Sequence, residues 1–361
     1  MKRILALLSL LFICGCAAAP ANLASATRVE PTPSGGRPPY AVLVDELSRP
    51  TTYTVSVVGG DGRAVAVQDA SKRSTPSTWL DLPYVSTTSR SLYFLDGDST
   101  VKLLPPDGAP ATTVATLPVG AHEEAGFAVS PDEAKIAVSV LDFNSSKVRV
   151  TLYVSTFPRL DLQQIFQSDS DYVWPVAWHS GLLVLAHAYA PYVEGALRAA
   201  PARDNPYWAI SYHIVDPATA NRMVLMGSCT VSGPLSPAGS ACIQGGTLDW
   251  QGNDTNWSTH DWGSISAAAS LSPDGSMVAA ADPDNPERLD FWRPGGSIAT
   301  WVQGPGTADW TGWLDATHVV IGSATIAGYR PRIVALTPGP SPAVFVEAQG
   351  FYAARLPTNI T

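Results

Sequence analysis

The sequence lacks the short motifs by which many enzyme families are recognised. It has no Gly-x-Ser-x-Gly nucleophile elbow, no phosphate-binding loop, no His-Glu-x-x-His pair and no glycine-rich dinucleotide fingerprint. Its six histidines (122, 179, 187, 213, 260 and 318) stand alone in the sequence, which favours separate structural roles over a shared active site. We therefore predict no catalytic residue.

Long hydrophobic runs are also missing, apart from one short run at the N-terminus. Lys2 and Arg3 precede the apolar stretch 4–13, which is shorter than the roughly 20 residues of a membrane-spanning helix. A charged start, a short apolar core and small residues after it are typical of a secretory signal. A retained membrane helix and an ordinary cleaved signal are the alternatives to the interpretation that follows.

The end of this segment, Ile13-Cys14-Gly15-Cys16, resembles the lipobox of bacterial lipoproteins. The resemblance implies that residues 1–15 are removed and that a diacylglyceryl thioether forms on Cys16. It predicts a protein outside the cytoplasm, anchored by lipid to a bacterial cell membrane or outer membrane. The resemblance does not name a substrate.

Residues 16–39 are rich in Ala, Pro, Ser, Thr and Gly, so we expect an extended tether that buries no core. Loss of Lys2 and Arg3 with the leader leaves 20 basic against 31 acidic residues, a net charge of −11. A negative protein is a poor partner for nucleic acid or for an anionic lipid surface. The lipid itself must then provide the membrane attachment.

Cysteine is scarce, and only Cys229 and Cys242 remain after Cys14 and Cys16 are assigned to the leader and the anchor. Two cysteines in an oxidising compartment predict a disulfide, with a stabilisation of about 2–3 kcal/mol in the chain-entropy model. Two buried free thiols are the alternative. A metal site is disfavoured, because no further Cys or clustered His lies nearby.

Helical periodicity is almost absent from residues 40–361. Short β-rich runs such as 40–44, 53–58, 91–95, 135–140 and 148–154 are each bounded by Gly, Pro, Asp or Ser. This pattern is typical of antiparallel all-β structure.

A repeat lies over these runs. Residues 127–138 match residues 269–280. Together with weaker copies they give turn positions at 87, 130, 180, 236, 272 and 315, which are 36 to 56 residues apart. With one further unit at the N-terminal side, the spacing predicts a single propeller of seven four-stranded blades over 40–361, with six blades as the alternative. The run 350–356 is expected to pair with the first strand and close the ring.

The repeat Ser-Pro-Asp-Gly followed by an apolar strand resembles that of TolB-like and other WD40-like propellers. Ser130-Pro-Asp and Ser272-Pro-Asp-Gly carry the resemblance, while the Trp-Asp pair of true WD40 units is not regular in this chain. Those families are six- or seven-bladed propellers, and most of them are binding platforms outside the cytoplasm. The resemblance therefore implies a propeller without naming a ligand.

Two kinds of ligand site are compatible with the loops. Acidic residues in 282–287 give a weak calcium candidate made of Asp282, Asp284 and Glu287, although Asp-Pro steps are also ordinary turns. Ten of the eleven Trp lie between 174 and 313, where they serve either stacking on a sugar or peptide or packing between blades. The candidate ligand-binding residues are Tyr207, Trp208, Trp250, Trp257 and Trp262.

The function expected from these observations is a non-catalytic binding or scaffolding module at the cell envelope. It would be a monomer without a cofactor, and its ligand would be an envelope protein or a glycan. One alternative is a propeller enzyme, a glycosidase or a lyase, with acidic residues in the central funnel. The other is a purely structural envelope protein.

Overall fold

The computed structural model describes residues 38–46, 48–74, 82–144, 147–189, 209–226, 235–242, 246–253, 269–281, 288–293, 296–302, 312–321, 331–336 and 343–357. They belong to one compact unit that begins at Pro38. Every regular element in these ranges is a strand, so the expected all-β class is confirmed. The described ranges contain no helix with the length and apolar character of a membrane span. The leader and Cys16 lie outside the described residues.

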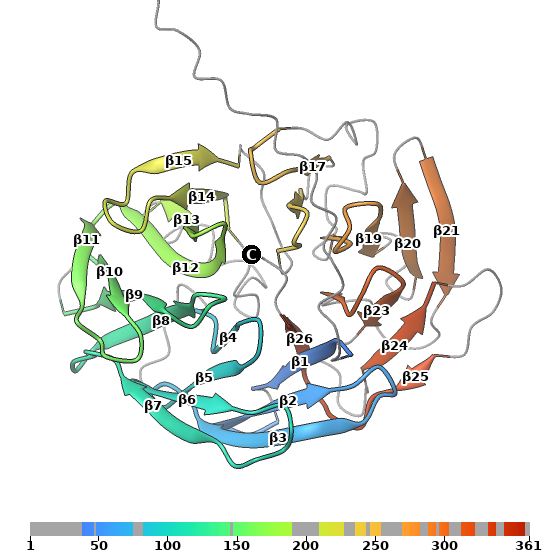
Figure 1. Cartoon of the computed structure of the whole chain (residues 1–361), viewed down its shortest axis with the longest axis horizontal. Coiled ribbons are helices and arrows are strands. Elements are labelled where there is room, and N and C mark those ends of the chain that lie inside the picture. The colour runs from blue at the N-terminus through green and yellow to red at the C-terminus, as the bar shows by residue number, and fades with distance from the viewer. Residues whose placement is uncertain are drawn as a thin grey trace, which may run out of the picture. The chain divides into compact units, whose positions relative to one another are not determined.

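Six four-stranded antiparallel sheets surround a common centre, as in a β-propeller (Figure 1). Five of these blades use strands that are consecutive in the chain. The second blade contains β4 (Val85–Thr87), β5 (Leu92–Asp96), β6 (Thr100–Leu104) and β7 (Thr112–Thr116). The third contains β8 (Glu123–Val129), β9 (Lys135–Asp142), β10 (Arg149–Thr156) and β11 (Gln163–Ser168).

The remaining consecutive blades follow the same order, with the first strand innermost. The fourth blade contains β12 (Asp171–His179), β13 (Leu182–Tyr189), β14 (Ser211–Val215) and β15 (Arg222–Leu225). The fifth contains β18 (Ser270–Leu271), β19 (Val278–Ala281), β20 (Arg288–Arg293) and β21 (Gly296–Val302). The sixth contains β22 (Gly312–Trp313), β23 (His318–Ile321), β24 (Arg332–Ala335) and β25 (Val344–Phe345).

The first blade is assembled from both ends of the domain. Its innermost strand is β26 (Phe351–Leu356), followed outward by β1 (Tyr40–Asp45), β2 (Thr52–Val58) and β3 (Ala64–Ser71). Tyr40 lies opposite Leu356 in the β1–β26 pairing, so the expected closure by the C-terminal run is confirmed. Pairing the two ends removes the sheet edges that an open ring would leave.

The expectation of seven four-stranded blades is wrong, because the described residues form six. The repeat unit at 236, the fifth of the seven expected in chain order, contributes within the described residues a two-stranded sheet, β16 (Ser240–Ala241) with β17 (Thr247–Leu248), between the fourth and fifth blades. The repeat spacing counts inner turns and not strands, and the turn at 236 is present as a bridge between Ser236 and Gly239. The surrounding Pro and Gly residues are poor strand formers, which explains why the described strands after this turn have only two residues each.

In the third and fifth blades, the repeat turn joins the first and second strands through a serine side chain that bonds to the backbone. The Oγ of Ser130 donates to Asp132 Oδ1 at 2.6 Å and accepts from Lys135 N at 2.8 Å. Ser272 makes the same two contacts, with Asp274 at 2.6 Å and Met277 N at 2.9 Å. These bonds satisfy turn groups that the strands leave unpaired, so the turn fixes where each inner hairpin begins.

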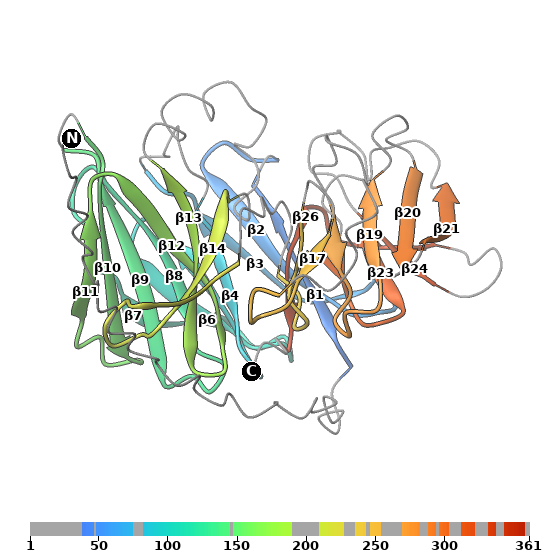
Figure 2. The same ribbon diagram turned by 90° about the horizontal axis from the view of Figure 1, so that it is seen from above.

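The core consists of apolar clusters between neighbouring blades. One cluster joins the third and fourth blades through buried side chains such as Val150 and Trp174, and another joins the fifth and sixth through Phe291 and Val319. Turning the view by 90° shows strands of successive blades standing side by side (Figure 2). Trp174 and Trp313 are each at most 4% exposed. Both residues therefore fill gaps between blades.

Candidate binding cavity at the centre of the ring

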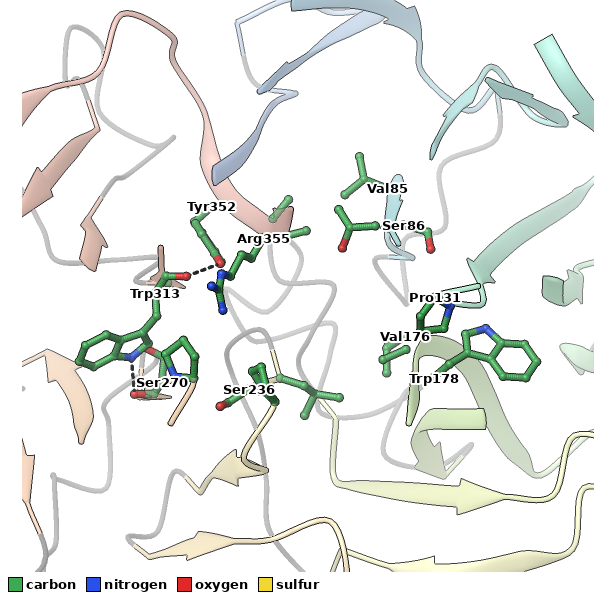
Figure 3. Close-up of a pocket in the computed structure, with 18 of the residues that line it drawn as sticks. Val85, Ser86, Pro131, Val176, Trp178, Ser236, Ser270, Trp313, Tyr352 and Arg355 are labelled. Carbon is green, nitrogen blue, oxygen red and sulfur yellow. Dashed lines mark hydrogen bonds between the residues drawn. The ribbon is translucent and has the colours of Figure 1, made fainter. Parts of the chain in front are cut away.

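A cavity lies where the C-terminal ends of the innermost strands β4, β8, β12, β18, β22 and β26 approach one another (Figure 3). The segment 235–237, which leads into β16, completes its wall. The cavity volume is about 80 Å³, well below the roughly 300–1,000 Å³ of pockets that enclose a whole small molecule. It can therefore hold one functional group of a larger ligand.

Arg355 is the only charged residue in the described wall of this cavity. Small and apolar residues such as Val85, Val176 and Ala353 form most of the remainder, and the described lining contains no Asp or Glu. The facing acidic residues that a funnel glycosidase would use are therefore not found among the described lining residues.

The position of Arg355 follows from the closure of the ring. It lies opposite Ala41 in the pairing of β26 with β1, and Figure 3 shows its side chain beside Tyr352. Its Nε and Nη1 atoms are buried and have no hydrogen-bond partner among the described residues. Burial lowers the pKa of the Arg355 guanidinium, although arginine stays charged at neutral pH.

Ser270, on β18, contributes a second polar group to the same wall. The residue is 3% exposed, and its Oγ has no hydrogen-bond partner among the described residues. Its main-chain oxygen is occupied, because it accepts the indole Nε1 of Trp313 at 3.0 Å. The hydroxyl is therefore a buried donor whose backbone is already fixed by the neighbouring blade.

Tyr352 belongs to the same wall and lies beside Arg355 (Figure 3). Its hydroxyl donates to the main-chain oxygen of Trp313 at 2.9 Å, and burial raises the pKa of the phenol. A Cβ on Gly312 would lie 2.0 Å from the Tyr352 ring, so only glycine permits this approach. The phenol is thus a fixed, neutral part of the wall.

Most of the site residues predicted from the sequence lie outside the described part of the chain. Tyr207, Trp208, Trp257 and Trp262, the calcium candidates Asp282, Asp284 and Glu287, and Cys16 and Cys229 all lie outside the described residues. Cys242 is buried directly after β16, and its pairing with Cys229 remains a prediction. In the described part of the chain, no group of three or more His, Cys, Asp or Glu side chains is arranged to hold a metal ion.

Trp250 is the one candidate aromatic that the structure describes. It is 5% exposed, stacks on His179 with ring centroids 4.6 Å apart, and donates from Nε1 to the Pro237 oxygen at 2.7 Å. In this arrangement Trp250 packs against the turn at 236 and holds it beside the fourth blade.

A second polar cluster lies on β12, β13 and β14, at the opposite end of β12 from the cavity. His187 Nδ1 is 3.1 Å from Ser211 Oγ, which is 3.3 Å from His213 Nε2. His187 Nε2 is 3.4 Å from Asp171 Oδ1, and the two imidazoles stack with centroids 4.4 Å apart. The expectation that each histidine stands alone is therefore wrong for His187 and His213.

The charges of this cluster follow from its burial. Burial lowers the pKa of His187. Burial and the neighbouring His187 ring together lower the pKa of His213 to about 4. Both rings are thus neutral at pH 7. The hydrogen-bond pattern then assigns the proton of His187 to Nε2, facing Asp171, and leaves Nδ1 to accept the Ser211 hydroxyl.

Arg355, Ser270 and the pair His187–His213 were not found from the sequence. Ser270 had a signal, because it occupies the place of Ala128 in the matched repeat 127–138, and a polar residue at a buried repeat position is unusual. The two histidines had none, since their contact depends on the pairing of His187 with Ser211 across β13 and β14.

Comparison with known proteins gives a likeness of fold alone. No family model matches the sequence, and no curated protein matches it. The fold is similar to that of an oligogalacturonate lyase from Vibrio parahaemolyticus, with a TM-score of 0.51 at 9% identity over 83% of this chain and 97% of that one.

Two further solved structures are less similar. An oligogalacturonate lyase in complex with manganese gives a TM-score of 0.47 at 8% identity, covering 80% of this chain and 86% of that one. Sqt1 of Saccharomyces cerevisiae gives 0.45 at 11% identity, covering 82% and 83%. Identities this low carry no function across, so the chain is described as a β-propeller.

Proposed function

We propose that this protein is a lipid-anchored, extracytoplasmic binding module whose ligand enters the central cavity of the propeller. The supporting observation is the cavity itself, which is walled by one segment from every unit of the ring and carries Arg355 as the single charged residue of its described lining. A ring of rigid strands presents such a group with little loss of conformational entropy on binding. The lipobox-like segment ending at Cys16 supports the anchor.

The anchor and the binding role need separate tests. Metabolic labelling with a clickable fatty acid is expected to mark the wild-type protein and not Cys16→Ser. Equal labelling of both would show that Cys16 carries no lipid.

The binding role is tested with a photo-crosslinking amino acid at Thr87, which lines the cavity and is partly exposed. The matched control places it at Val67, which is 57% exposed on the outer strand β3. Crosslinks to an envelope component are expected in intact membranes from position 87 and not from position 67. The same products from both positions, or none from position 87, would contradict a ligand in the cavity.

A second candidate function is nucleophilic catalysis at Ser211. The order of carboxylate, imidazole and hydroxyl in Asp171, His187 and Ser211 is the one that activates a serine. Ser211 is 7% exposed, and the two imidazoles line a cavity of about 120 Å³. A fluorophosphonate probe would label Ser211 in the wild type and lose it in Ser211→Ala if the site is catalytic. An unlabelled wild type leaves these residues a structural role.

A further inference from the structure

Arg355 is partly buried in the wall of the cavity. Its Nε and Nη1 atoms are buried and have no acceptor among the described residues, and a donor left in this state weakens the structure unless a ligand or water satisfies it. Among the described residues, Asp315 is the carboxylate that acts on the Arg355 guanidinium through its charge. Its oxygens are already used by its own turn, at 2.7 Å from Thr317 N and 2.9 Å from His318 Nδ1.

Ser270, in the same wall, also carries a buried polar atom without a described hydrogen-bond partner. Its Oγ is buried without a described partner, and leaving a buried hydroxyl unsatisfied costs about 1–3 kcal/mol. β22, with Gly312 and Trp313, lies between β18 and β26 in chain order around the ring, and residues of all three strands line the cavity. Both residues therefore belong to the wall of one small cavity, each with a buried donor that has no described partner.

We propose that this cavity binds one anionic group, a carboxylate or a phosphate, between the Arg355 guanidinium and the Ser270 hydroxyl. The inference rests on the proposed function, because it names the chemistry that the cavity recognises. A guanidinium offers several N–H donors in a plane that matches the oxygens of such anions. A cation is disfavoured by the single positive charge in the described wall, and a neutral group would leave that charge uncompensated.

The size of the cavity restricts how the ligand is bound. About 80 Å³ accommodates the anionic group and little else, so the rest of the ligand must extend outside. Tyr352 does not compete with the anion for Arg355, because its buried phenol is neutral and donates to the main-chain oxygen of Trp313.

The test uses the full lipidated protein in neutral detergent, with unfolding followed by tryptophan fluorescence. Sodium phosphate, sodium acetate and sodium chloride are compared at equal ionic strength in a cationic buffer, so that the phosphate and acetate arms separate the two sources of the anion. A saturable rise in melting temperature is expected with phosphate or acetate beyond that with chloride. In Arg355→Gln the apparent Kd should weaken roughly tenfold or more, and in Ser270→Ala by less.

Arg49→Gln is the matched control, because Arg49 is an exposed arginine paired with Asp69 in the first blade; it should keep the wild-type response. A second measurement distinguishes the loss of anion binding from a folding defect of Arg355→Gln. In chloride alone, Arg355→Gln should melt at the same temperature as the wild type or higher, since an uncompensated buried charge is removed. A lower melting temperature in chloride would mean that Arg355 is satisfied within the protein, and would overturn the inference.

Two further results would overturn the inference. One is a wild-type melting temperature that responds identically to all three salts. The other is a response to phosphate and acetate that is the same in Arg355→Gln as in the wild type. In either case crosslinking from position 87 still reports on the proposed function. Crosslinks that persist without an anion effect mean that the cavity binds a ligand of other chemistry. Crosslinks that are lost while the anion effect persists mean that the anion site serves some other purpose.

Discussion

The indole Nε1 of Trp313 donates a hydrogen bond of 3.0 Å to the main-chain oxygen of Ser270, on the innermost strand of the neighbouring blade. Trp178 makes the equivalent bond to Ala128, at 3.1 Å, between the fourth and third blades. Ala128 and Ser270 hold the same position in the two matched repeats, 127–138 and 269–280. The ring thus uses one device twice to fix the spacing of its inner strands.

Replacing Trp313 by Phe should lower the free energy of unfolding by about 1–3 kcal/mol, because the Ser270 oxygen loses its donor inside the core. Trp178→Phe should have an effect of similar size. Urea denaturation followed by circular dichroism measures both. Phe345→Leu is the control, since Phe345 is 64% exposed, and it should change stability by less than about 0.5 kcal/mol. Equal effects of all three substitutions would contradict the role of the indole bonds.

A buried ion pair joins the segment that follows the first blade to β8 of the third blade. Arg73 Nε is 3.5 Å from Glu124 Oε1, with both side chains 3% exposed, and the same guanidinium donates to the oxygens of Leu82 and Ala125. Arg73→Met should cost about 3–5 kcal/mol, because it leaves a carboxylate buried without its cation. Adding Glu124→Leu should recover part of that loss. A double variant less stable than Arg73→Met would show that the charge is not the cause.

Gly312 should not tolerate even a methyl group. Its Cβ would lie 2.0 Å from the Tyr352 ring, so Gly312→Ala requires the phenol to leave its bond to Trp313 and should lower the melting temperature by several degrees. Gly126→Ala is the matched control, because a Cβ there meets Leu82 at an ordinary 3.5 Å. Comparable losses at the two positions would argue against the close approach of Tyr352.

The stability of the domain should fall on mild acidification because of the two buried histidines. The pKa of His213 is lowered to about 4 in the folded state, against about 6.5 in an unfolded chain. The unfolded state therefore binds more protons between these values. The contribution of the neutral His213 to the free energy of unfolding is fully present above pH 6.5, and it is lost as the pH falls toward 4.

The free energy of unfolding, measured in urea at pH 7 and at pH 5, should therefore decrease less in His213→Gln than in the wild type. His122→Asn, at an exposed position, should keep the wild-type difference. A wild-type difference that is unchanged by His213→Gln would assign the pH dependence to other groups.

The sequence was sufficient for the fold class because the signal is local. Ser130-Pro-Asp and Ser272-Pro-Asp-Gly close their turns with their own side chains, so the repeat reports the inner hairpins directly. The blade count was overestimated because the same kind of turn at Ser236 is followed by strands of only two residues. A turn motif predicts that a hairpin starts and says nothing of how far its strands extend.

The candidate site depends on contacts between residues far apart in the chain. Arg355 reaches the cavity because β26 returns to pair with β1, and Ser270 reaches it from the fifth blade. In the sequence, Arg355 is only one charged residue in an alternating strand. Its significance comes from the lack of an acceptor around it, which is a property of the assembled ring.

The most direct test of an anion-binding site in the central cavity is an anomalous difference map. The map is calculated from crystals of the mature protein that have been soaked in selenate. A peak is expected in the central cavity, with oxyanion oxygens about 2.8 Å from the Arg355 guanidinium and within hydrogen-bonding reach of Ser270 Oγ. The peak should vanish in crystals of Arg355→Gln. A central cavity without a peak, in crystals whose surface sites are occupied by selenate, would contradict it.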